Sequence, residues 1–195
     1  PDSILSVARL ARTNLVDAPL TSLENLRDPT EGANYLVIYY DAFQTAAKAL
    51  ADARKTRLPL GGNGPFLTKA IPVSALFDQF SGGRTDPAAI RNFLRAAYYN
   101  WSTRPSFVTF LGDASYDFKN LTGRAPTGQP GTLVPTFENG FDDNYRLKRQ
   151  FATDDWLLNV DAASSELFVP DFFGGRLPAP GNVAPKLTLR PIEPH

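Results

Sequence analysis

The segment FVTFLGDASY, residues 107–116, determines the fold class that the sequence predicts. Its first half, Phe107 to Leu111, is a short apolar run of the kind that forms a strand buried on both faces of a sheet. The run stops at Gly112-Asp113, so we expect a carboxylate at the carboxyl end of that strand, where open α/β sheets bind their ligands. An aspartate in such a position also bonds its own backbone in a tight turn, so the motif fits either a site or a turn.

A strand, a helix and a second strand are predicted upstream of this segment. Tyr35 to Tyr40 has the apolar centre of a core strand. Asp41 and Gln44 follow with the spacing of a capping box, which predicts a helix that ends near Thr56. Phe66 to Val73 is predicted as the next strand, and Pro72 within it favours the edge of a sheet.

Two more helices are predicted before residue 107. The first begins with Ser74 as its cap and ends at Gly82, which supplies a left-handed residue. The second and longest begins at Asp86-Pro87, with Asp as N-cap and Pro in the first helical position. Apolar residues recur along it at helical spacing, which predicts a face packed on a sheet; they are Ile90, Phe93, Leu94, Ala97, Tyr98 and Trp101.

This alternation predicts a doubly wound α/β domain, with a mostly parallel sheet flanked by helices. We assign residues 34–178 to this domain, residues 1–33 to a connecting segment and residues 179–195 to a Pro-rich tail. Leu133 to Phe137 and Glu166 to Val169 are expected to add strands at the far edge.

Composition limits the chemistry. The chain has 195 residues, of which 43% are hydrophobic and 21% charged, and its twenty basic and twenty acidic residues cancel. With no net charge, the chain has no overall electrostatic attraction for nucleic acid. No apolar run is long enough to cross a bilayer. Cysteine is absent and the one histidine is His195. No serine or cysteine triad can be assigned within the chain, because the nucleophile needs a base within hydrogen-bond reach.

Acidic residues cluster as Asp113 with Asp117, Asp142 with Asp143, and Asp154 with Asp155. Carboxylates of this kind either hold calcium or lie solvated in turns. None has the spacing of an EF-hand loop, and Asp113 and Asp117 are the weak metal candidates. No other cofactor is expected.

Six segments in this order resemble the gingipain-like cysteine peptidases of family C25, a group that includes a cell-surface, sortase-like member of the type IX secretion pathway. They are Asn25–Tyr40, Phe77–Trp101, Phe107–Phe118, Val134–Phe137, Phe151–Trp156 and Pro170–Pro178. The resemblance implies the amino-terminal part of a catalytic domain that is secreted or held at a bacterial cell surface. It also implies a protein or peptide substrate, and a cysteine and histidine supplied by a second, carboxy-terminal half.

The resemblance implies one site residue in this chain. Arginine-specific members carry a Ser-Asp pair whose acid lies at the bottom of the pocket for the basic side chain, and Thr153-Asp154 matches it. The other interpretation of Asp154 is a cap of the turn before Trp156. Two further functions stay open: a non-catalytic module of the same fold in a surface or secretion assembly, and, least favoured, a flavodoxin-like ligand-binding module. Whether the parent protein is an active enzyme is left open.

Overall fold

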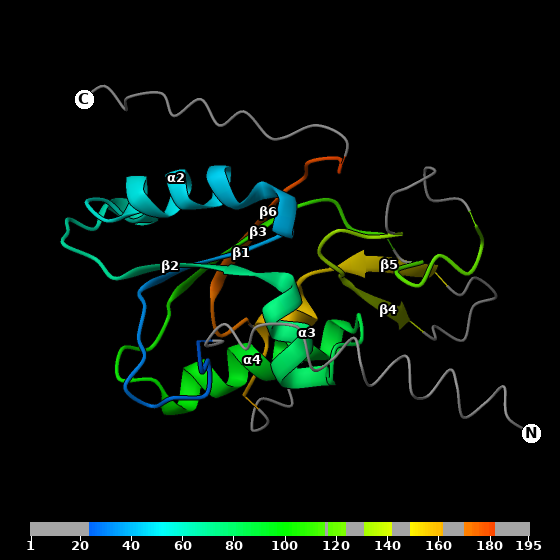
Figure 1. Ribbon diagram of the computed structural model, residues 1–195, viewed down its shortest axis with the longest axis horizontal. Coiled ribbons are helices and arrows are strands. Elements are labelled where there is room, and N and C mark those ends of the chain that lie inside the picture. The colour runs from blue at the N-terminus through cyan, green and yellow to red at the C-terminus, as the bar shows by residue number, and fades with distance from the viewer. Residues whose placement is uncertain (1–23, 116, 124–130, 142–148, 162–169, 182–195) are drawn as a thin grey trace, which may run out of the picture.

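A four-stranded parallel sheet with helices on both faces forms the centre of the molecule (Figure 1). The computed structural model describes residues 24–115, 117–123, 131–141, 149–161 and 170–181, with the backbone alone for residues 138–141 and 149–151. The α/β fold class with a parallel sheet is therefore confirmed. Among the described helices, none has the length and apolar character needed to cross a membrane.

The strands of the sheet all end at one edge. In spatial order they are β2 (Thr68–Pro72), β1 (Tyr35–Tyr39), β3 (Phe107–Leu111) and β6 (Phe173–Leu177), and every pairing is parallel. Tyr39 pairs with Pro72 on one side and Leu111 on the other, and Leu111 pairs with Leu177. The loops that follow the four strands therefore emerge together, at the edge where α/β proteins bind ligands.

Helices cover the two faces unequally. Helix α2 (Gln44–Arg54) lies on one face, and α3 (Val73–Ser81) and α4 (Pro87–Asn100) lie on the other (Figure 1). Short 3-10 turns occupy Asp41–Phe43 and Pro59–Gly61, and the one-turn helix α5 (Asp155–Leu158) lies beside α4. Strands β4 (Phe137–Phe141) and β5 (Arg149–Thr153) form a separate antiparallel hairpin.

Alternating side chains of the strands form two cores. Leu36 and Ile38 of β1 pack with Ile90 and Phe93 of α4. The intervening Val37 packs in the other cluster, on the side of α2. This division follows from the two-residue period of a strand, which sends successive side chains to opposite faces.

The predicted start of α4 and the predicted C-terminal end of α3 are confirmed. The Asp86 carboxylate accepts a hydrogen bond of 2.8 Å from the Ala88 amide at the start of α4, and Pro87 is the first helical residue. Gly82 ends α3 with φ of 64°, in the left-handed region that favours glycine.

The capping predictions at Asp41 and Ser74 are wrong. Neither side chain caps a helix: α3 begins one residue earlier, at Val73, and α2 has no side-chain cap. Instead the Ser74 hydroxyl donates to the Asp41 carboxylate. The hydroxyl and the carboxylate are thus hydrogen-bonded to each other between the residues that follow β1 and β2. Local sequence could not predict this bond, because it depends on the pairing of two strands.

The structure also corrects the far side of the sheet. β3 is fully buried only toward α4, because Phe107 and Thr109 are half-buried on the α2 side. β6 was not predicted, since its Gly174-Gly175 pair is unfavourable for a strand. Leu133–Phe137 adds no strand to this sheet: only Phe137 is in a strand, the β4 of the hairpin, and 166–169 lie outside the described residues.

Part of the predicted connecting segment packs on the domain. Leu26 is buried, and its carbonyl accepts a hydrogen bond of 3.0 Å from the Trp101 indole N–H. Residues 1–23 of that segment, and 182–195 of the predicted tail, lie outside the described residues.

Candidate functional site at the carboxyl edge of the sheet

Arg176 is the central residue of the carboxyl edge. It is the fourth residue of β6, and its side chain lies on the α4 face of the sheet, with its guanidinium carbon 5.2 Å from the centroid of the Phe110 ring. Its Nη1 donates to the carbonyls of Gly112, at 2.9 Å, and Val134, at 2.8 Å. The side chain therefore ties β6 to the end of β3 and to the loop after residue 131.

The rest of the guanidinium binds Asp154. Nε donates to Oδ2 at 2.9 Å and Nη2 to Oδ1 at 2.7 Å, the bidentate geometry that suits arginine and carboxylate. Both side chains are shielded, with 15% of Arg176 and 20% of Asp154 exposed. The Thr136 hydroxyl lies 2.9 Å from Asp154 Oδ1 and 2.9 Å from the Thr153 carbonyl, which holds the carboxylate from a second side.

These contacts bear on the role predicted for Asp154. Both of its carboxylate oxygens are hydrogen-bonded to groups of this chain, so a guanidinium from a substrate has to displace Arg176 to bind in the same bidentate way. Binding of a basic substrate side chain by Asp154 stays a prediction. Asp155 is exposed and begins α5, and its amide donates to the Thr153 hydroxyl at 3.1 Å.

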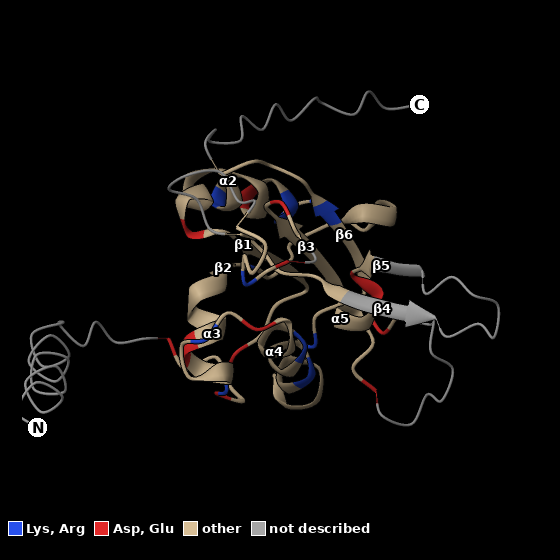
Figure 2. Ribbon diagram, turned by 90° about the vertical axis from the view of Figure 1, so that its right-hand side faces the viewer, with Lys and Arg blue, Asp and Glu red and all other residues tan. Residues whose placement is uncertain are grey.

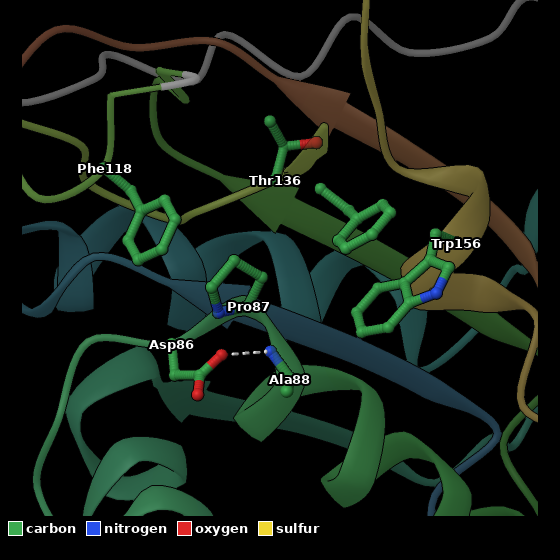
Figure 3. A pocket seen from close by; sticks show the side chains of 7 residues that line it. Asp86, Pro87, Ala88, Phe118, Thr136 and Trp156 are labelled. Carbon is green, nitrogen blue, oxygen red and sulfur yellow. Dashed lines mark hydrogen bonds between the residues drawn. The ribbon is translucent and has the colours of Figure 1, made fainter. Parts of the chain in front are cut away.

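An aromatic pocket of about 200 Å³ (Figure 3) adjoins this ion pair through Thr136. Phe118 and Trp156 lie on opposite sides of it, with Pro87 between them. Phe137 stacks on Trp156, with 4.1 Å between ring centroids. The wall is completed by Asp86, Ala88 and Thr136, and Thr136 also contacts Asp154. The pocket and the ion pair thus form one site, which we call the carboxyl-edge site.

The positions of the two pocket walls are fixed by neighbouring elements. The guanidinium of Arg91 lies 4.8 Å from the centroid of the Trp156 ring, and its Nε donates to the Asn159 carbonyl at 2.8 Å. Asp86 bonds the first turn of α4, which sets Pro87 and Ala88 in place. Local sequence predicted this helix cap, but it did not predict that rings from residues 118, 137 and 156 meet in front of it.

Of the two metal candidates, Asp117 holds a local turn and Asp113 makes backbone contacts with distant segments. Asp117 accepts hydrogen bonds from the amides of Leu121, at 2.7 Å, and Thr122, at 2.8 Å, and from the Thr122 hydroxyl, at 2.6 Å. The Thr122 bonds hold the pKa of Asp117 below its usual value. The backbone of Asp113 bonds Leu133, Val134 and Ala179.

No group of three or more potential metal ligands gathers among the residues that the structure describes. Asp142 and Asp143 lie outside them.

Sequence reasoning missed Arg176 and Thr136. Prediction of β6 as a strand would have placed Arg176 on an inward face, where a basic residue needs a carboxylate partner such as Asp154 or Asp155. The contact joins residues 22 positions apart in sequence, so local pattern could not choose between the two acids.

The parallel sheet and its flanking helices define an α/β domain, and a comparison with protein families gives the family. The sequence profile of peptidase family C25 matches residues 28–182, so the chain belongs to that family. The recognition made from the six sequence segments is confirmed.

Comparison with solved structures gives a match at the level of fold. The crystal structure of dimeric latent PorU from Porphyromonas gingivalis is similar, with a TM-score of 0.58 and 19% sequence identity. The match covers 76% of this chain and 14% of the PorU chain. The chain thus spans a small part of the length of that relative. No curated protein matches the chain significantly.

Proposed function

We propose that this chain is the amino-terminal scaffold and substrate-pocket part of a secreted, gingipain-like cysteine endopeptidase. The proposal is supported by membership of peptidase family C25 together with the carboxyl-edge site, where an aromatic pocket opens beside the ends of the parallel strands. The chain has no cysteine, and its single histidine is His195. In this proposal the nucleophile and its base are supplied by a second, carboxy-terminal half.

In this proposal the chain performs binding and positioning. Arg176 joins four backbone segments at the edge and keeps the pocket walls in register with β3 and β6. Such pre-organisation matters because a substrate misplaced by about 1 Å loses a large part of its rate enhancement. Asp154 has two available roles: contact with a basic substrate side chain after release of Arg176, or anchor of Arg176. Its bidentate geometry favours the anchor.

A second function is a non-catalytic module in a cell-surface or secretion assembly. One observation favours it: the acidic residue at the predicted basic-side-chain pocket is already paired with Arg176. In this alternative the edge binds a partner protein and no bond is cleaved.

A cleavage assay with the longest natural polypeptide that contains this chain distinguishes the two functions. The peptidase proposal predicts cleavage of a mixed peptide library in the presence of a thiol reductant, and loss of that cleavage after alkylation with iodoacetamide. A folded polypeptide that cleaves nothing in the library supports the non-catalytic module instead.

A further inference from the structure

The aromatic pocket of the carboxyl-edge site has the size of one side chain. An apolar cavity of about 150 Å³ holds a benzene-sized ligand. The volume of about 200 Å³ between Phe118, Pro87 and Trp156 is therefore enough for a leucine or phenylalanine side chain (Figure 3). It is too small for two such groups.

The chemistry of the wall selects apolar ligands. Three aromatic rings and a proline line the pocket. Of the two nearest carboxylates, Asp154 is held by Arg176 and Thr136, and Asp86, in the wall, accepts the Ala88 amide at the first turn of α4 through Oδ1. Three rings and a proline favour the burial of an apolar side chain, whereas an ammonium or guanidinium buried against them loses its hydration. We propose that this pocket binds a leucine or phenylalanine side chain of a peptide, in preference to a basic one.

The Trp156 wall of the pocket is held in place before any ligand binds. Trp156 is stacked on Phe137, with 16° between the ring planes, and Arg91 lies 4.8 Å from its ring centroid. Rings fixed in this way lose little conformational entropy on binding, so more of the contact energy contributes to affinity. This inference rests on the proposed function for the peptide nature of the ligand, but the pocket itself can be tested without catalysis.

The test is a titration of the ¹⁵N-labelled chain with three small amides: N-acetyl-phenylalanine amide, N-acetyl-leucine amide and N-acetyl-arginine amide. The chain has two tryptophans, so its spectrum contains two indole N–H signals, which Trp156→Phe assigns. We expect saturable shifts of the Trp156 signal with the two apolar amides, with dissociation constants on the order of 1 mM, as expected for ligands of this size. Binding of the arginine amide should be at least about tenfold weaker. The buried Trp101 indole is the internal reference and should not shift.

A matched pair of substitutions on α4 tests whether the amides bind in this pocket. Ala88 is half-buried in the wall of the pocket, and Ala96, also half-buried, lines a different hollow on α4. Leucine is well tolerated in helices, so both variants should fold. Ala88→Leu should fill the pocket and abolish the Trp156 shifts, whereas Ala96→Leu should leave them unchanged.

Three results would overturn the inference: no shift of the Trp156 signal with any amide, equal or tighter binding of the arginine amide, or undiminished binding by a folded Ala88→Leu variant. Each of them leaves the peptidase proposal standing, since that proposal depends on cleavage by the complete polypeptide. Conversely, a polypeptide that cleaves nothing leaves the measured binding intact.

Discussion

Arg176 and Asp154 form a bidentate ion pair that joins strand β6 to the residue after β5. The same guanidinium bonds two backbone carbonyls, those of Gly112 and Val134. One side chain therefore connects the last strand of the sheet, the end of β3, the loop that leads to the hairpin and the start of α5. Its planar fork is required for this, because lysine presents a point charge without fixed geometry.

The first prediction concerns stability. Arg176→Lys keeps the charge but loses the fork, so the free energy of unfolding should fall by about 1–3 kcal/mol, less than for a fully buried pair. Urea unfolding measures this difference. Arg95→Lys is the control, since Arg95 is exposed on α4, and its effect should stay within about 0.5 kcal/mol. Equal unfolding midpoints for the two variants would contradict the anchoring role.

The second prediction separates the two roles of Asp154. As an anchor, Asp154→Asn in the complete enzyme should lower cleavage of basic and apolar substrates alike and reduce thermal stability. As a contact of a basic side chain, the same change should reduce the specificity constant after basic residues alone, by about 10-fold to 1000-fold. Asp155→Asn is the matched control, because Asp155 is exposed. A selective loss at basic residues would establish the substrate contact and remove the case for the anchor.

The third prediction concerns the chain on its own. It should cleave no peptide, because it has no cysteine and no histidine other than His195 at its last position. The assay is incubation of the purified chain with a mixed peptide library and a thiol reductant. Cleavage that persists through repurification, and that disappears after substitution of a residue of this chain, would refute the assignment of the nucleophile to another segment.

The fourth prediction concerns the incompletely covered face of the sheet. On the α2 side, a groove of about 320 Å³ runs over β3 and β6, where Phe107 and Phe173 stack with centroids 5.4 Å apart. Phe173 is 64% exposed, and Leu60 at the groove's side is 80% exposed. Parallel sheets are normally covered on both faces, so we expect the isolated chain to self-associate or bind a hydrophobic dye through this groove.

Two serine substitutions test the groove. Phe173→Ser should reduce dye binding and self-association, measured by fluorescence and by sedimentation. Leu121→Ser is the control, since Leu121 is 84% exposed and lies outside the groove. A monodisperse chain that binds no dye would count against a missing carboxy-terminal half that docks here.

Comparison of sequence with structure shows which signals are local. β1, β3 and α4 were predictable because each carries its own periodicity and its own end signals, such as Asp86-Pro87. β6 was not predictable, because a contact distant in sequence requires glycine at position 174: a Cβ there would lie 2.2 Å from Leu158. The carboxyl-edge site follows the same rule. Its position after β3 could be predicted from Gly112-Asp113, whereas Arg176, Thr136 and the three rings come together only through the folded chain.

Binding of substrate at the carboxyl edge of this chain is tested most directly by cleavage with the complete polypeptide after the aromatic pocket has been filled by substitution. Ala88→Leu should lower the specificity constant for peptides with leucine or phenylalanine by about tenfold or more, whereas Ala96→Leu on the same helix should leave it within about twofold, a difference of more than about 1 kcal/mol in transition-state stabilisation. Equal activity of the two variants, with both folded, would contradict the claim that substrate binds at this edge.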